Sequence, residues 1–399
     1  MDFLILGAGP AGLTFANKLK RDGKSFLIIE KEMKAGGLCR SEIVDDYPFD
    51  IGGGHFLDVK YKEVNDFLFE FMPRDEWMLY ERNSKISMNG MIISHPLEAN
   101  IWQMDFERQV EYLKSIAMAG CNIGQDMPSK FIDWIYWKLG KKIADGYMIP
   151  YNKKLFGEDL NELGTYWLEK LPDVSFDETL MSCLKRKAYG CEPGHTQFLY
   201  PIKYGYGEIW RRMAEKIENH IVYSRAVNSI DFSTNTVTLS GYEKYSAKYI
   251  VTTIPWMEFD EILGMPEDIV TLIEKLKYSS IYTSYHAENL NTDAQWIYYP
   301  SPDLPYHRIL VRHNFCIGSR GYWTETNSRR FAIDGEKTYF YNRYAYPLNT
   351  VQKPNIMDKL LNWAKSRNVF GLGRWGEHQH YNSDVVVKRA LDLYDAVCG

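Results

Sequence analysis

The chain has 399 residues, of which 45% are hydrophobic and 25% charged, as is usual for a globular protein of two or three domains. Its formal net charge of −5 excludes a general attraction to nucleic acid or to acidic membranes, so a bound anion needs a local cluster of cations. No run of about eighteen apolar residues could span a membrane, and the six cysteines lack metal-ligand spacing, so we expect a cytoplasmic protein with reduced thiols and no metal.

The first thirty residues have the pattern strand, tight turn, helix, strand and acid. Gly7 permits the turn, Gly9 lets the backbone approach a pyrophosphate at the helix N-terminus, and Gly12 lets helix and strand pack closely. Glu30, at the end of the second strand, can accept from a ribose hydroxyl. A tight turn without a ligand is the alternative, but an acid about twenty residues after the glycines favours a Rossmann-type dinucleotide-binding unit.

Two further glycine clusters follow. Gly36 and Gly37 allow a second close backbone approach, and Gly52–Gly54 directly precede His55. Three consecutive glycines are costly to order and rarely serve packing alone. We therefore predict that this loop lies against the flat ring of a cofactor, with His55 beside it. The alternative is a hairpin turn with a solvated histidine.

The segment from residue 60 to 170 is expected to be mainly helical, with one hairpin. Apolar residues share a helical face within 60–72, and Asn89-Gly90 predicts a strand pair near 80–95. In the block 104–170, Phe106, Val110 and Leu113 share one face, and Ser129 is a candidate cap for the helix that follows.

The remaining chain returns to strands. Short strands at 221–256 end in Thr253 and would complete the nucleotide-binding sheet, and alternating residues at 278–346 predict an antiparallel sheet with one wet face. A helix is expected near 355–366. The last helix should be capped by Asn382, Ser383 or Asp384 and bury Val387, Ala390, Leu391 and Tyr394.

The predicted fold class is thus α/β, with a discontinuous Rossmann-like domain, an inserted helical domain and an antiparallel-sheet substrate domain. The expected boundaries are residues 1–80, 205–275 and 355–399 for the Rossmann-like domain. They are 100–200 for the helical domain, and 81–99 with 276–354 for the substrate domain.

Several motifs resemble those of the FAD-dependent amine oxidase and protoporphyrinogen oxidase superfamily. They are GAGPAGL (7–13), GGGHFL (52–57), TTIP (252–255) and GRWG with YNSD (373–384). Within the superfamily, four segments are more similar to UDP-galactopyranose mutase. These are YNKKLFGEDLNEL (151–163), PYHRILVRHNF (305–315), YAYPLN (344–349) and GRWGEHQHYNSD (373–384).

The resemblance implies an isomerase that interconverts the pyranose and furanose forms of a nucleotide-linked galactose for surface polysaccharide. In that family, N5 of reduced FAD attacks the anomeric carbon and expels the nucleotide diphosphate, without net redox. It also implies FAD active in its reduced form, NAD(P)H as the external reductant, a nucleotide-sugar partner and a possible homodimer through the helical domain.

Site residues follow from the resemblance position by position. Arg308, which would steady the leaving diphosphate, and His55, beside the flavin, would be the catalytic residues. The substrate-binding residues would be Tyr151, Asn152, Phe156, Arg308, Tyr344, Tyr346 and His380. The FAD-binding residues would be Gly7, Gly9, Gly12, Glu30, Lys31, Gly37, Leu38, Gly53, Gly54, His55, Val227, Thr253, Arg374, Asn382 and Ser383.

Four of these residues also have an interpretation in which their role is purely structural. Arg308 could be a surface arginine on an edge strand, Tyr344 and Tyr346 packed sheet aromatics, and Arg374 an ion-paired core arginine.

The sequence also departs from the family. Val174 stands where the family has a mobile-loop arginine that grips the diphosphate. Asn152 and Phe156 replace a threonine and a tryptophan, while His380, Asn382 and Asp58 replace a tyrosine, an aspartate and a histidine. Losing the arginine would cost a charge-assisted contact unless Lys170, Lys185, Arg186 or Lys203 supplies another cation. A dTDP- or GDP-linked sugar, or a modified galactose, therefore fits as well as UDP-galactose.

Two other functions remain open at this point. An oxidoreductase of the amine oxidase type would take a hydride onto the flavin, and a decayed site would leave a flavin with a structural role. An oxidase needs an apolar tunnel, whereas a mutase needs phosphate donors. Convergence of Arg308, Tyr346 and Tyr151 would favour the mutase.

Overall fold

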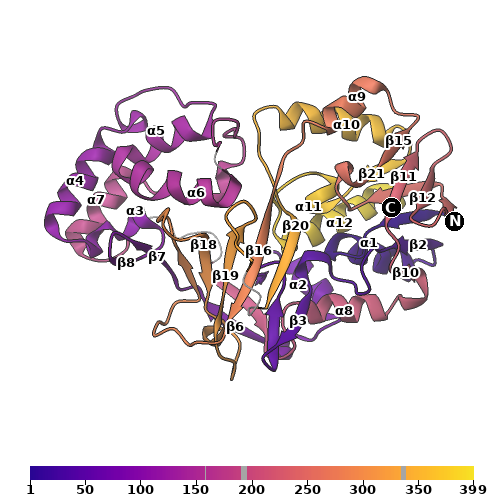
Figure 1. Cartoon of the computed structure of the whole chain (residues 1–399), viewed down its shortest axis with the longest axis horizontal. Helices are drawn as coiled ribbons and strands as arrows, with labels where there is room; N and C mark the ends of the chain where they lie inside the picture. The colour runs from indigo at the N-terminus through magenta and orange to yellow at the C-terminus, as the bar shows by residue number, and fades with distance from the viewer. Residues whose placement is uncertain (158, 190–195, 334–337) are drawn as a thin grey trace.

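The computed structural model describes residues 1–157, 159–189, 196–333 and 338–399. A parallel sheet with both chain termini lies on one side, a helical lobe lies on the opposite side, and a large sheet stands between them (Figure 1). The α/β fold class predicted from the sequence is confirmed. The domain boundaries remain a proposal.

The parallel sheet is formed by the apolar runs expected from the sequence. In spatial order its strands are β10 (Ile221–Val222), β2 (Phe26–Ile29), β1 (Phe3–Leu6), β14 (Tyr249–Thr252) and β21 (Val369–Gly371). Alternate residues of β1 enter different cores, since Phe3 and Ile5 pack with one cluster and Leu4 and Leu6 with another. Both faces are therefore buried, as a doubly wound parallel sheet requires.

Helices cover the two faces of this sheet. On one face lie α1 (Pro10–Arg21), α2 (Lys62–Phe69), α8 (Gly207–Glu215) and α12 (Ser383–Cys398). On the other lie α9 (Glu267–Ile273), α10 (Lys353–Lys365) and a four-stranded sheet of β13 (Lys244–Ser246), β12 (Thr236–Leu239), β11 (Val227–Asp231) and β15 (Glu261–Leu263). The short helix α11 (Gly373–Gly376) precedes α12. Asn382 is the N-cap residue of α12, but its side chain makes no capping hydrogen bond.

The large sheet contains both the predicted antiparallel segment and the predicted hairpin. In spatial order its strands are β20 (Tyr339–Pro347), β16 (Tyr278–His286), β19 (Tyr322–Asn327), β18 (Tyr306–Leu310), β17 (Trp296–Tyr298), β7 (Ser84–Met88) and β8 (Met91–Ser94). Asn89 and Gly90 both have positive φ, as a two-residue hairpin turn requires. All neighbouring strands are antiparallel except β17 and β7.

The helical lobe differs from the sequence-based expectation in one detail. Its helices are α3 (Leu97–Asn100), α4 (Phe106–Ala117), α5 (Phe131–Ile143), α6 (Ile149–Phe156) and α7 (Phe176–Lys185). The apolar face shared by Phe106 and Val110 on α4 does not enter the core, because these residues are 71% and 48% exposed. The predicted cap was wrong, because α5 begins after Lys130 and no side chain caps it.

Two small sheets hold the glycine loop. β3 (Ser41–Val44) pairs with β4 (Tyr47–Asp50), whereas β5 (Leu57–Asp58) and β6 (Trp77–Glu81) pair with β9 (Gln197–Pro201). The loop carrying Gly52–Gly54 therefore passes from one sheet to another and is not a hairpin turn, which overturns that alternative.

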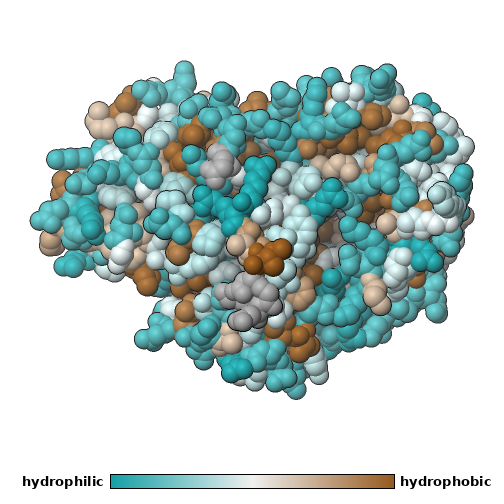
Figure 2. Space-filling view, viewed as in Figure 1, coloured by the Kyte–Doolittle hydropathy of each residue, from teal (hydrophilic) through white to brown (hydrophobic). Residues whose placement is uncertain are grey.

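The visible surface is mostly hydrophilic, with small hydrophobic areas (Figure 2). Among the described residues no helix has the length and apolarity to cross a membrane.

Candidate active site

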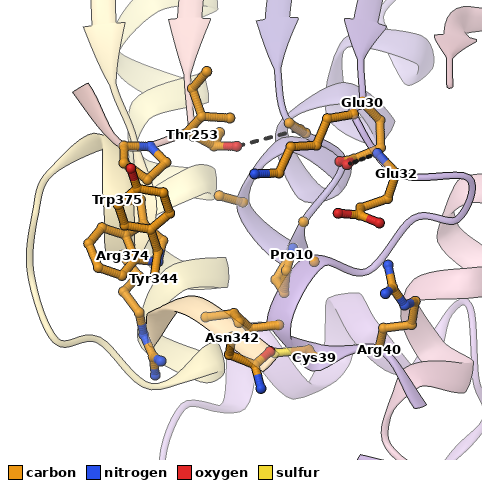
Figure 3. A pocket seen from close by; sticks show the side chains of 18 of the residues that line it. Pro10, Glu30, Glu32, Cys39, Arg40, Thr253, Asn342, Tyr344, Arg374 and Trp375 are labelled. Atoms are coloured by element: carbon orange, nitrogen blue, oxygen red, sulfur yellow. Dashed lines mark hydrogen bonds between the residues drawn. The ribbon is translucent and has the colours of Figure 1, made fainter. Parts of the chain in front are cut away.

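The larger of two adjacent cavities, with a volume of about 440 Å³, lies beyond the carboxyl ends of β1, β2 and β14. This edge of an open α/β sheet is where ligands usually bind. Glu30 and Glu32 lie on one side, Tyr344, Arg374 and Trp375 lie on the opposite side, and Pro10 of α1 lies between them (Figure 3). The cavity is thus bounded by the dinucleotide fingerprint and by the C-terminal segment.

Glu30 is held at the end of β2 by two backbone groups. Its carboxylate accepts hydrogen bonds from Ala8 N at 2.7 Å and from Glu32 N at 2.9 Å. Burial nevertheless raises the pKa of Glu30, and the two hydrogen bonds oppose that rise. Each oxygen keeps a second lone pair, so this carboxylate can still accept from a ribose hydroxyl.

The glycines of the fingerprint have different tasks. A Cβ at Gly12 would collide with the carbonyl oxygen of Gly7, whereas a Cβ at Gly9 would meet nothing within 4 Å. Gly12 is therefore needed for helix and turn to pack, while Gly9 leaves the N-terminus of α1 open toward the cavity. Such a terminus presents free N–H groups to phosphate.

Two buried donors also line the larger cavity. Trp375 Nε1 has no hydrogen-bond partner among the described residues, and Arg40 Nε has none beyond an ion pair with Glu42 at 3.4 Å. Because buried donors are rarely left unsatisfied, they point to a polar ligand in this cavity. The residues present therefore fit a dinucleotide such as FAD.

The smaller cavity, of about 230 Å³, adjoins the larger one. Both are lined by His55, Arg374 and Ser383. The remaining lining comes from the glycine loop, helix α6, the large sheet and the C-terminal segment, and includes Phe56, Tyr151, Phe198, Trp296, Arg308, Tyr346 and His380. A ligand in either cavity would therefore contact His55, Arg374 and Ser383.

Arg308 is fixed from behind by Glu325. Its Nη2 lies 2.6 and 2.7 Å from the two carboxylate oxygens, and Tyr346 donates to the same carboxylate at 3.2 Å. Glu325 is fully buried, and the adjacent Arg308 guanidinium lowers the pKa of this carboxyl to about 2 against the effect of burial. Arg308 Nε is buried and has no partner among the described residues.

Arg308 is not a surface residue. Strand β18 lies inside the sheet, and the Arg308 side chain is only 20% exposed. In the Arg308 guanidinium, Nη2 is therefore hydrogen-bonded to Glu325, whereas the buried Nε–H has no partner among the described residues. An unsatisfied N–H on a cation suits the binding of an anion.

His55 is neutral at the junction of the cavities. Burial and the nearby Arg374 lower the pKa of His55 to about 3. Its Nδ1 lies 3.0 Å from the carbonyl oxygen of Gly53, and since a carbonyl only accepts, Nδ1 carries the proton. Nε2 is then an acceptor available to a ligand.

Arg374 is held by backbone carbonyl groups. Its guanidinium donates to Tyr381 O at 2.8 and 3.0 Å and to Ala345 O at 3.2 Å. Burial lowers the pKa of Arg374. Within the described residues no carboxylate pairs with it, so the alternative of an ion-paired core arginine is wrong.

A crystal structure of reduced UDP-galactopyranose mutase superposes on the chain with a TM-score of 0.90 at 22% identity, covering 99% of this chain and 93% of that one. The chain has the fold of UDP-galactopyranose mutase. Oxidases that also match over the whole length, protoporphyrinogen oxidase-like and putrescine oxidase structures, have TM-scores of 0.61 to 0.74. The predicted resemblance is confirmed at the level of the fold.

Sequence comparisons agree with the mutase fold over shorter stretches. Residues 5–71 match the family of NAD(P)-binding Rossmann-like domains. UDP-galactopyranose mutase of Mycoplasma pneumoniae is 31% identical over 78 residues, which cover 19% of this chain and 20% of that protein. A probable flavin-containing monoamine oxidase A of Dictyostelium discoideum is 22% identical over 285 residues, or 64% of this chain and 57% of that protein. The chain thus spans less than two thirds of the length of these relatives.

Within the mutase fold, most residues expected to bind FAD line one of the cavities. The larger cavity contains Gly7, Gly9, Glu30, Lys31, Gly37, Leu38, His55, Val227, Thr253, Arg374 and Ser383. Gly54 and Asn382 line the smaller cavity, whereas Gly12 and Gly53 line neither. Gly53 instead faces Glu325. Its φ is +93°, and a Cβ at this position would lie 2.5 Å from Glu325 Oε1.

The residues expected to bind substrate divide into three groups. Tyr151, Arg308, Tyr346 and His380 come together in the smaller cavity. Tyr344 lines the larger cavity instead. Asn152 and Phe156 line neither, since the Asn152 amide donates to Met148 O and Phe156 packs on Trp167.

The sequence analysis missed Glu325, Arg82 and Trp296 as site residues. No motif marks them, and Glu325 becomes recognisable only once the strand register places it opposite Arg308. Of the cations considered as replacements for the family arginine, Lys185, Arg186 and Lys203 line neither cavity, and the side chain of Lys170 lies outside the described part of the chain.

Proposed function

We propose that the protein is a flavin-dependent mutase that interconverts the pyranose and furanose forms of a nucleotide sugar. One observation carries the proposal: a cavity suited to FAD shares His55, Arg374 and Ser383 with a cavity lined by Arg308, Tyr346 and Tyr151. A sugar held by its diphosphate at Arg308 would then lie beside the cofactor.

A reduced FAD bound in the larger cavity would supply the nucleophile for the anomeric carbon of the sugar. Arg308 would stabilise the diphosphate as negative charge builds on it, because its buried Nε–H faces no competing acceptor among the described residues. Tyr346, whose hydroxyl donates to Glu325 and accepts from Arg308, would help to hold Arg308 in this orientation. Glu325 holds Arg308 in place without reaching the substrate, so it is a positioning residue.

Part of the wall of the smaller cavity is apolar and would limit the access of water to a bound sugar. Phe56, Phe198, Trp296 and Leu155 give it an apolar side. Such a lining would protect a sugar detached from its nucleotide from hydrolysis until the diphosphate returns. His55 Nε2 would accept a hydrogen bond from the sugar or the cofactor at the junction.

The proposal is tested by incubating the dithionite-reduced FAD-bound protein with a panel of UDP-, dTDP- and GDP-linked sugars and separating the products chromatographically. We expect a furanose product from at least one pyranose substrate, and about 100-fold slower turnover in Arg308→Gln with flavin still bound. Arg320→Gln is the matched control, because Arg320 is 60% exposed and pairs with Asp45. No product from any sugar, or full activity in Arg308→Gln, would contradict the proposal.

An oxidoreductase acting on amines is the second candidate, favoured by the match to the monoamine oxidase over 64% of the chain. Against it, the smaller cavity contains Arg82, Arg308 and Arg374. Asp58 and Asp384 line the same cavity and Glu325 pairs with Arg308, so a protonated amine is disfavoured mainly beside Arg82, whose hydrogen-bond partners are uncharged. Flavin reduction by amines under anaerobic conditions would support this candidate.

Several finer assignments belong to the same proposal. The sugar would be UDP-galactose or a relative, the external reductant NAD(P)H, the compartment the cytoplasm and the product a precursor of surface polysaccharide. The panel of substrates and a comparison of flavin reduction by NADH and NADPH address the first two.

A further inference from the structure

The site of the family arginine is occupied here by a buried apolar residue. Val174 is 5% exposed, immediately before Ser175, which caps helix α7, and it lines neither cavity. A diphosphate carries two negative charges, and Arg308 is already paired with Glu325. A second cation is therefore needed if a diphosphate is to bind tightly in the smaller cavity.

Arg82 lines the smaller cavity from the connection between β6 and β7. Its Nε donates to Ser84 Oγ at 2.9 Å, its Nη2 donates to Tyr298 OH at 2.8 Å, and its guanidinium lies 5.2 Å from the centre of the Trp296 ring. These three partners are uncharged, so Arg82 is positioned without being neutralised. A stacked, hydrogen-bonded guanidinium is also pre-organised to bind an anion.

The strand register places Tyr298 and Arg308 on the same face of the large sheet, and a hydrogen bond joins Arg82 to Tyr298. Tyr298, which accepts from Arg82, is the cross-strand partner of Arg308. Side chains directly opposite each other in an antiparallel pair project to the same face, with Cβ atoms about 5 Å apart. The Tyr298 ring also lies 5.5 Å from Tyr151. Arg82, Tyr151 and Arg308 therefore line one cavity, with Tyr298 in contact with the first two.

Two carboxylates also line this cavity, and nearby backbone groups stabilise the negative charge of each. Asp58 accepts from Lys60 N at 2.9 Å, and Asp384 lies in the first turn of α12, where the helix dipole favours negative charge. The hydrogen bonds of the Arg82 guanidinium within the described part of the chain go to Ser84 and Tyr298.

We propose that Arg82 is the second diphosphate-binding cation of this protein and does the work of the arginine missing at Val174. The inference rests on the proposed function, because it assumes that a nucleoside diphosphate group occupies the smaller cavity. Arg82 and Arg308 would hold the diphosphate from two sides of Tyr298, each through charge-assisted hydrogen bonds.

Binding of UDP, dTDP and GDP to the FAD-bound protein, measured by calorimetry with the matching nucleosides as references, tests the inference. We expect Arg82→Gln to weaken the best-binding diphosphate roughly 10- to 100-fold while its nucleoside is unaffected, and Arg82→Lys to weaken it less. Lys85→Gln is the control, because Lys85 lies on β7, outside both cavities, and contacts Ser94. Flavin absorbance and melting temperature establish that each variant is folded.

The outcomes separate the two proposals. Equal diphosphate affinity in Arg82→Gln and the unsubstituted protein would overturn the inference about Arg82 and leave the proposed function intact. Weaker binding of the nucleotide sugar alone, with unchanged diphosphate affinity, would place Arg82 at the sugar and also overturn it. A flavin-loaded protein that binds none of the three diphosphates would contradict the proposed function itself.

Discussion

Glu325 is the residue on which the substrate side of the site depends most. Its two oxygens accept from Arg308 and Tyr346, and one of them lies 3.5 Å from His307 Nε2. Burial lowers the pKa of His307, so the imidazole is neutral and the charge of Glu325 is balanced by Arg308. Removing one member of a buried pair leaves the other charge uncompensated.

We therefore expect Glu325→Gln to lower the free energy of unfolding by roughly 3 kcal/mol at neutral pH. The folded-state pKa of Glu325 is about 2 and the unfolded value is 4.5, so its stabilisation is complete above pH 4.5 and is lost as the pH falls toward 2. The difference between the unsubstituted protein and the variant, measured by urea unfolding at several pH values, should shrink below pH 4.5. Glu288→Gln is the control, because Glu288 is exposed. A difference that does not vary with pH would refute this account of the pair.

Residues that belong to a local pattern could be assigned from the sequence, and residues that depend on distant partners could not. Gly9 and Glu30 stand in a motif whose spacing implies their environment, and Arg308 was assigned through the family resemblance of the segment around it. Glu325 and Arg82 acquire theirs from strand register, across 17 residues to Arg308 and 216 residues to Tyr298. Tyr344 and Tyr346 look alike in the sequence but face different cavities, Tyr344 the larger and Tyr346 the smaller.

At the scale of elements, the turn into α1 decides whether a dinucleotide can bind. A side chain at residue 9 would point into open space beside the cavity, while one at residue 12 would collide with backbone. The backbone at Gly9, with φ −80° and ψ −177°, is accessible to alanine.

We expect Gly9→Ala to fold with nearly the melting temperature of the unliganded protein but to bind FAD much more weakly, since the methyl group occupies the phosphate approach. Gly12→Ala should instead lower the melting temperature of the unliganded protein itself. Thermal unfolding and FAD titration of the two variants provide the comparison. If Gly9→Ala and Gly12→Ala behaved identically, the assignment of Gly12 to packing and of Gly9 to cofactor binding would be wrong.

Helix α4 shows where periodicity alone fails. Its apolar residues Phe106 and Val110 lie outside, while Gln109 is buried and its amide donates to Met104 O at 2.7 Å and to Trp102 O at 3.3 Å. An amide whose hydrogens are satisfied by backbone carbonyls can be buried. The sequence contains no sign of those carbonyls, so the apolar periodicity of this helix does not reveal which of its faces is buried.

At the scale of the whole molecule, the exposed side of the helical lobe is the surface most suited to self-association. Phe106, Val110 and, on α7, Leu184 are 71%, 48% and 70% exposed, and α4 packs against α7. The Arg186 guanidinium lies 5.8 Å from the Phe106 ring, so the two helices present one continuous surface.

We expect the protein to form a homodimer through this surface, because apolar side chains grouped in this way gain by being buried. Light scattering after size exclusion should give twice the chain mass of 46.6 kDa. Phe106→Glu with Leu184→Glu should restore the single-chain mass, while Ile92→Glu on β8, at another 63% exposed position, should not. A monomeric unsubstituted protein, or a dimer that survives the double substitution, would argue against this surface.

The sheets and the segments between them bring together residues from both ends of the chain at the junction of the two cavities. His55 arrives from the glycine loop, and Arg374 and Ser383 arrive from the C-terminal segment. The parallel sheet and the glycine fingerprint were predictable, since their signals are local. The junction was predictable only through the resemblance, because it depends on how the sheets are placed relative to one another.

The most direct test of that junction is a difference spectrum of the bound flavin during titration with nucleoside diphosphates. A diphosphate in the smaller cavity must disturb His55 and Arg374, so we expect a saturable change in flavin absorbance that weakens strongly in Arg308→Gln. A protein that stays colourless when FAD is supplied, or a flavin spectrum indifferent to every diphosphate, would contradict the account.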